Sequence, residues 1–117
     1  MVSDAGQLHG SNNRTKQTAL TDTGAAINGR ADTPNMHDLL TGSPPNGSFI
    51  AGAPSTTCAH WTMGDKGSAM VGHHDRTGFD ESAPAKSWNL SHQSHSCSAD
   101  RLKPTGGAGL CCCFAAD

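Results

Sequence analysis

The sequence predicts an α+β module in which short β-strands are joined by long loops. Apolar runs at residues 49–51, 69–71 and 110–116 are separated by turn residues at intervals too short for ordinary helices. One short helix is expected over residues 98–103, with Ser98 as its N-cap and Pro104 as its stop signal. Two separated cysteines, each close to a tryptophan, indicate a loop-rich module that is pinned by a disulfide.

The composition leaves little apolar material for a core. Leu, Ile, Val and Phe together number 14 in 117 residues, below the roughly 20% typical of packed domains, while the net charge is only −2. Fourteen glycines and six prolines accompany them. One domain at most is expected, stabilised by disulfides, a metal or a partner. Five cysteines in so small a chain favour an oxidising compartment.

Several function classes find no support in the sequence. Basic residues do not cluster, so no nucleic-acid partner is expected. No run approaches the ~18 apolar residues of a membrane span, and the polar first ten residues show no signal peptide. If the parent protein is exported, its signal lies upstream. No nucleophile–base motif is present, which favours a non-enzymatic protein.

The chain divides into a short arm and one domain. Residues 1–19 are polar and aperiodic, and we expect them to form a poorly ordered arm. Residues 20–117 would form the domain. Within it, residues 37–40 are predicted to be a short strand or a single helical turn, and residues 41–47 a loop rich in glycine and proline.

An ordered set of motifs connects this chain with a known family. They are Thr57-Cys58-Ala59-His60-Trp61-Thr62, Val71-Gly72-His73-His74-Asp75-Arg76, Ser87-Trp88-Asn89, Gly106-Gly107-Ala108-Gly109-Leu110 and Cys113-Phe114. The sequence resembles the C-terminal part of a bacterial secreted lectin-like family with a C-type-lectin-like, endostatin-like fold. The resemblance implies a partial domain of this fold that lacks the N-terminal helical part, from a secreted or periplasmic parent protein.

The resemblance also implies how the cysteines pair. Cys58 would bond to Cys97; the alternative is that all five thiols are reduced and buried. Cys113 would be free or joined to another chain, because no cysteine precedes Cys58. The chain has Cys111-Cys112-Cys113 where the family has two aromatic residues and a cysteine. Adjacent cysteines bridge one another only with strain.

The implied function is extracellular binding of a carbohydrate or cell-surface glycan, without catalysis. The binding face is predicted to comprise Trp88, Asn89, His92 and the loop His73-His74-Asp75-Arg76. In the alternative interpretation, Asp75 and Arg76 tie loops together through hydrogen bonds. Both tryptophans would then be core residues, and for Trp61 we expect this core position. A second hypothesis is a structural or protein-interaction module that contacts another protein through its long loops or a free cysteine.

Two further hypotheses concern the binding of calcium and of zinc. Trp88-Asn89 resembles the Trp-Asn-Asp element of calcium-dependent lectins, but Leu90 replaces the aspartate and removes an oxygen ligand. A histidine-based zinc domain is the third functional hypothesis. Its candidate constellation is His73, His74 and Asp75 with His92 and His95. His92 and His95 are three residues apart and could meet one ion on a helical turn. No cofactor is assigned from the sequence.

Overall fold

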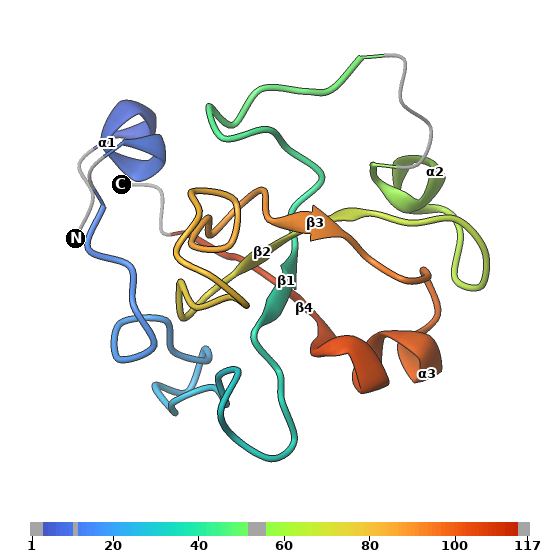
Figure 1. Ribbon diagram of the computed structural model, residues 1–117. Coiled ribbons are helices and arrows are strands. Elements are labelled where there is room, and N and C mark those ends of the chain that lie inside the picture. Colours follow the sequence, from blue (N-terminus) through green and yellow to red (C-terminus); the bar gives the residue numbers. More distant parts are fainter. Residues whose placement is uncertain (1–3, 11, 52–55, 115–117) are drawn as a thin grey trace.

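The computed structural model describes residues 4–10, 12–51 and 56–114, and their architecture is α+β, as predicted (Figure 1). The elements in chain order are α1 (Ala5–His9), β1 (Asp38–Leu40), α2 (Cys58–Trp61), β2 (Met70–His73), β3 (His92–Gln93), α3 (Ala99–Leu102), the 3-10 helix η1 (Lys103–Thr105) and β4 (Gly107–Cys111). Every element is short, so loops make up most of the chain. No described helix has the length and apolar character needed to cross a membrane.

The strands form one mixed sheet at the centre of the molecule, in the order β3-β2-β1-β4 (Figure 1). β1 and β2 are antiparallel, with Asp38 opposite His73, and β2 and β3 are antiparallel, with Val71 opposite His92. β1 and β4 are parallel. β1 is therefore a central strand, and its side chains are enclosed by neighbours from distant parts of the sequence.

The core is small and contains many polar groups. Its fully buried side chains of largest volume are Leu39, Val71, His74 and Asn89. The other buried apolar residues are Ala19, Cys58, Ala69, Trp88 and Leu102. Burying so many polar side chains is tolerable only where they find partners, because an unpaired buried polar group costs about 1–3 kcal/mol. The polar partners in this core therefore decide much of its stability.

The predicted disulfide is present and joins Cys58 to Cys97 across 39 sequence positions. It attaches α2 to the segment that leads into α3. All four residues of α2, from Cys58 to Trp61, have positive φ, so α2 is a left-handed turn. The core position expected for Trp61 is wrong: its side chain is 51% exposed. The left-handed turn leaves the indole at the surface, where one edge approaches Gly42.

The predicted strands are confirmed in part. Residues 38–40 form β1, and the run at 69–71 overlaps β2. The strand expected at 110–116 instead begins at Gly107 and ends at Cys111; residues 115–117 lie outside the described residues. The strand expected at 49–51 is wrong, because Phe49 is 63% exposed and this run pairs with none of the four strands. An apolar run without a partner strand has no way to satisfy its backbone groups as a sheet.

The predicted helix exists as α3, but its end differs from the expectation. Ser98 occupies the N-cap position without a side-chain cap hydrogen bond. Pro104 does not stop the helical path; it lies at the start of η1. Proline is compatible with the first turn of a helix, where its missing N–H would have had no intrahelical partner.

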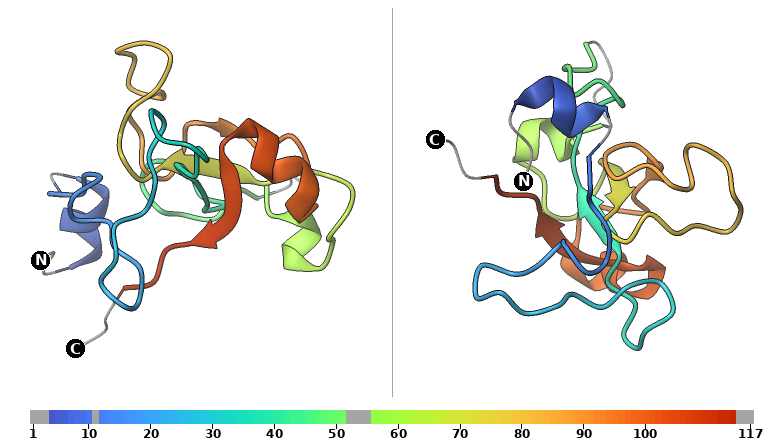
Figure 2. Two further views of the ribbon diagram at one scale, coloured as in Figure 1. Left: turned by 90° about the horizontal axis from the view of Figure 1, so that it is seen from below. Right: turned by 90° about the vertical axis from the view of Figure 1, so that its left-hand side faces the viewer.

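The described part of the N-terminal arm lies against the domain, on the same side as the end of β4 (Figure 2). It contains α1, which Asp4 caps by accepting a hydrogen bond from the backbone N–H of Gln7 at 2.8 Å. The ring of His9 stacks on Trp88 with centroids 5.4 Å apart. The Arg14 guanidinium lies 5.0 Å from the same indole and donates a hydrogen bond to Cys112.

Candidate metal centre

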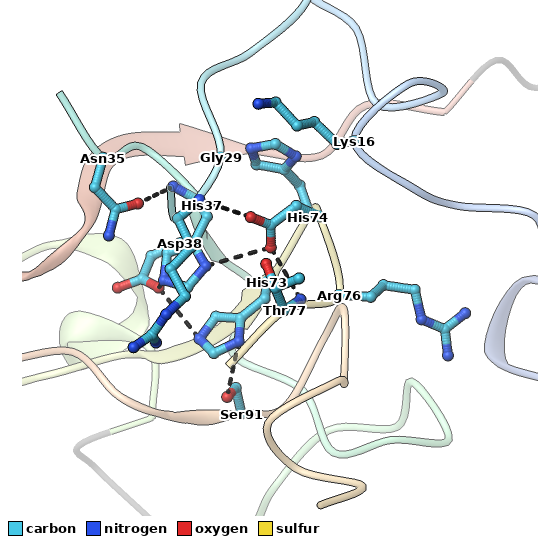
Figure 3. A network of polar contacts seen from close by, with 12 residues as sticks. Lys16, Gly29, Asn35, His37, Asp38, His73, His74, Arg76, Thr77 and Ser91 are labelled. Carbon is cyan, nitrogen blue, oxygen red and sulfur yellow. Dashed lines mark hydrogen bonds and ion pairs between the residues drawn. The ribbon is translucent and has the colours of Figure 1, made fainter. Parts of the chain in front are cut away.

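The sheet register brings a histidine–aspartate dipeptide against two other histidines. His37 precedes β1, Asp38 begins it, and His73 ends the neighbouring strand β2 opposite Asp38. The His37 carbonyl accepts a hydrogen bond from the His74 backbone N–H, and the Asp38 N–H donates to Gly106, each at 3.0 Å. Both sides of the dipeptide are thereby anchored. Figure 3 shows the side chains of His37, Asp38 and His73 directed toward one another.

One carboxylate oxygen is the centre of this cluster. Asp38 Oδ1 lies 3.2 Å from His37 Nε2, 3.4 Å from His73 Nε2 and 3.7 Å from His92 Nε2. Despite these short distances it has no hydrogen bond within the described structure, and neither has His73 Nε2. Asp38 is only 4% exposed, so water does not readily compensate. The nitrogens are near the oxygen, but no N–H is aligned with it.

The opposite ring nitrogens explain this arrangement. His73 Nδ1 donates to the Ala85 carbonyl at 2.7 Å, and His37 Nδ1 donates to Asp75 Oδ1 at 3.3 Å. We assign the ring proton to Nδ1 in both cases because carbonyl and carboxylate oxygens only accept. A neutral imidazole that is protonated at Nδ1 presents a lone pair at Nε2. When both rings are neutral and carry the proton on Nδ1, two lone pairs face the Asp38 carboxylate oxygen, and a cation between them would remove that repulsion.

The electrostatics of the surrounding groups fit this protonation pattern. Burial lowers the pKa of His73, which favours its neutral form. Burial raises the pKa of Asp75, but hydrogen bonds from His37 and from the backbone N–H groups of Arg30 and Thr77 outweigh it and hold that pKa well below the ordinary range. Asp75 therefore stays an ionised acceptor behind His37.

His92 differs from the two buried histidines. Its interaction with Asp38 raises its pKa, against the opposing effect of burial. Its side chain is half exposed, and its Nδ1 lies 2.9 Å from the Gln93 carbonyl. A protonated His92 can thus form an ion pair with Asp38 from the solvent-exposed side of the cluster. The tightest group comprises His37, Asp38 and His73, whose ligand atoms all lie within 4.8 Å of one another.

No family model, curated protein or solved structure was found to match this chain.

The cluster opens onto a pocket of about 1080 Å³. His37, His73 and His92 line it together with the exposed side chain of His95. The pocket gives solvent and small molecules access to the histidines that surround the buried carboxylate.

The predicted binding residues are divided between this cluster and other places. His73 and His92 belong to the cluster, and Asp75 supports it through His37. His95 lines the pocket without joining the three-residue group. His74 is fully buried and its Nε2 lies 3.0 Å from the Asn28 carbonyl.

Trp88, Asn89 and Arg76 are not among the pocket-lining residues. Both Trp88 and Asn89 are buried, and the Asn89 amide donates to the Pro44 carbonyl at 2.8 Å. Arg76 Nε donates to the Lys86 carbonyl at 3.2 Å. Arg76 thus ties loops together, as the alternative interpretation of this segment predicted.

Sequence reasoning missed His37 and Asp38, which hold the centre of the cluster. Their signal was weak: two ligand-type residues side by side at the start of a short strand, without a recognisable metal-binding spacing. Only the pairing of β1 with β2 makes them neighbours of His73.

Proposed function

We propose that this chain binds one divalent transition-metal ion, with zinc as the expected ion, through His37 Nε2, Asp38 Oδ1 and His73 Nε2. The observation that carries the proposal is the buried Asp38 oxygen, which has no hydrogen bond and lies 3.2 and 3.4 Å from the Nε2 atoms of two imidazole rings. A cation at this point would convert three mutually unfavourable groups into ligands.

The spacing of the donor atoms supports the proposal. Ligand atoms bound at 2.0–2.2 Å around a tetrahedral zinc ion lie about 3.3–3.6 Å from one another. The separations from Asp38 Oδ1 to His37 and His73, 3.2 and 3.4 Å, agree with that spacing. The His37 and His73 ring planes are nearly parallel, so at least one ring would have to rotate for both Nε2 lone pairs to meet one ion.

The outer contacts are those that metal-binding histidines use. A ligating histidine usually donates its other N–H to a carboxylate or carbonyl, which orients the ring and fixes its tautomer. Asp75 has this role for His37, and the Ala85 carbonyl has it for His73. The two rings also stack with centroids 4.1 Å apart, which restrains both orientations.

Zinc is the ion we expect, because a site with histidine and carboxylate ligands suits its tetrahedral coordination. Two histidines and one carboxylate also suit iron(II), but nitrogen and oxygen sites generally bind zinc more tightly. The Cys58–Cys97 disulfide favours an oxidising compartment, where the redox-inert zinc ion keeps its charge. Calcium prefers six to eight oxygen ligands, which this cluster does not offer.

Within this proposal the protein is an extracellular, non-catalytic binding module of the C-type-lectin-like class. The motif resemblance supports the class, and the disulfide supports secretion into an oxidising compartment. Carbohydrate binding stays a prediction, and the metal pocket is a more accessible place for a ligand than the buried Trp88 and Asn89.

The test is a zinc titration of chelator-treated protein against a competing chromophoric chelator. We expect one zinc per chain, and at least a tenfold loss of affinity in Asp38→Asn, which keeps the side-chain shape but removes the charge. His95→Ala is the matched control, because His95 lines the pocket outside the three-residue group; it should retain full affinity. Circular dichroism would verify folding. Folded protein that binds no zinc, or Asp38→Asn with unchanged affinity, would refute the proposal.

A further inference from the structure

The pocket beside the metal site contains an arginine whose contacts leave its polar edge available. The Arg30 guanidinium carbon lies 3.8 Å from the centre of the Phe79 ring. Within the described part of the chain, no carboxylate lies within ion-pair distance of this guanidinium. Arg30, Phe79 and the metal-site histidines line the same pocket.

The position of Phe79 is informative because its side chain is 95% exposed. A phenylalanine so exposed gains little from burial, and its ring lies under the Arg30 guanidinium carbon. Stacking on an aromatic ring orients an arginine and leaves its N–H groups, which lie in the guanidinium plane, directed outward. The contact with Phe79 thereby holds the Arg30 guanidinium at the pocket wall, where its N–H groups can donate hydrogen bonds.

We infer that this pocket takes a small oxyanion, a carboxylate or a phosphate, that is bound at once by the metal ion and by Arg30. The inference rests on the proposed metal site. Three protein ligands leave a fourth position of a tetrahedral ion for an exogenous ligand, as in zinc sites that bind substrates. The guanidinium fork matches the geometry of both oxyanions.

The charges in the pocket favour an anion once the ion is bound. Asp38 neutralises only part of the charge of a divalent ion, and Arg30 adds a further positive charge. Asp80 is the other acidic group in the lining, and its carboxylate accepts a hydrogen bond from the Ser82 backbone N–H. The ion and Arg30 are the two positive groups at the pocket and attract a small anion locally, while the carboxylates of Asp38, Asp75 and Asp80 balance their summed charge.

Among carbohydrates, this pocket would favour an acidic sugar over a neutral one. A neutral sugar would offer only hydroxyl groups to the metal and to Arg30, whereas a uronic acid offers a carboxylate. An acidic sugar and a simple carboxylate share the chemistry that the pocket recognises, so experiment has to distinguish them.

The experiment uses the whole chain loaded with cobalt(II), whose visible absorption changes when a ligand of the ion is exchanged. Acetate, glucuronate, inorganic phosphate and glucose are titrated separately. We expect the oxyanions to change the spectrum and glucose to leave it unchanged. A higher affinity for glucuronate than for acetate would identify an acidic sugar as the preferred source of the carboxylate, and a higher affinity for phosphate would identify a phosphate ligand.

Arg30→Gln is the decisive variant, with Arg101→Gln as the matched control because Arg101 is exposed on α3, outside the pocket lining. Arg30→Gln should weaken oxyanion binding about tenfold and leave cobalt affinity unchanged, while Arg101→Gln alters neither. If cobalt binds but no oxyanion changes its spectrum, or Arg30→Gln binds oxyanions as the wild type does, the inference alone fails. If cobalt does not bind, the proposed function fails with it. If His92→Ala loses cobalt as completely as Asp38→Asn, His92 fills the fourth position and the inference is overturned.

Discussion

Removing the disulfide should destabilise this protein by about 4 kcal/mol. The perturbation is the double substitution Cys58→Ala/Cys97→Ala, which leaves no unpaired thiol at either position. The bond spans 39 positions, and the chain-entropy model gives a loop of this size about 4 kcal/mol at 25 °C. Domains of this kind are stable by only about 5–15 kcal/mol, so the loss is a large part of the whole.

Urea unfolding of the oxidised wild type and the double variant, followed by tryptophan fluorescence, measures the difference. Cys113→Ala is the control, because Cys113 is an exposed free cysteine and its removal should change stability by no more than about 0.5 kcal/mol. The melting temperature of the double variant should fall by on the order of 15 °C. A loss below about 1 kcal/mol would refute the reasoning, since the sheet and loops would then not depend on this crosslink.

Two further predictions concern packing and the free thiols. Gly72→Ala should destabilise the protein by about 3 kcal/mol or more, because the added methyl group would meet the Trp88 carbonyl oxygen at 1.8 Å, whereas Gly64→Ala, with no atom within 4 Å, should be nearly neutral. Thermal unfolding of the two variants checks this, and equal stabilities would contradict it. Iodoacetamide should modify the exposed Cys111 and Cys113 before Cys112, because burial shields Cys112 and raises its pKa despite the nearby Arg14. Peptide mapping over time gives the three rates, and equal rates would show that β4 does not end as described.

Local sequence patterns were sufficient for several elements. The helix at 99–102 forms where the residue pattern predicts it, because short-range preferences and neighbouring turn residues agree there. Residues 38–40 form a strand, which was one of the two alternatives for residues 37–40. The Cys58–Cys97 bond was predicted from the motif resemblance. Patterns failed at Phe49, where a run of apolar residues has no strand to pair with, and at Trp61, which a left-handed turn leaves exposed.

The candidate site was only partly accessible to sequence reasoning. His73 and His92 were identified as binding residues because histidines gather in their segments. His37 and Asp38 were seen only as a possible strand. A strand turns successive side chains to opposite faces, so a shift of one residue in the pairing of β1 with β2 would take Asp38 away from His73.

The sequence by itself determined that this chain has little apolar core, is rich in loops and needs a crosslink. Those properties follow from composition, which does not depend on how the chain is arranged. The tertiary structure alone decided that Asp38 meets two histidines from other segments at one buried oxygen. The physical reason is that sheet register and burial depend on contacts between distant segments, and no local pattern contains them.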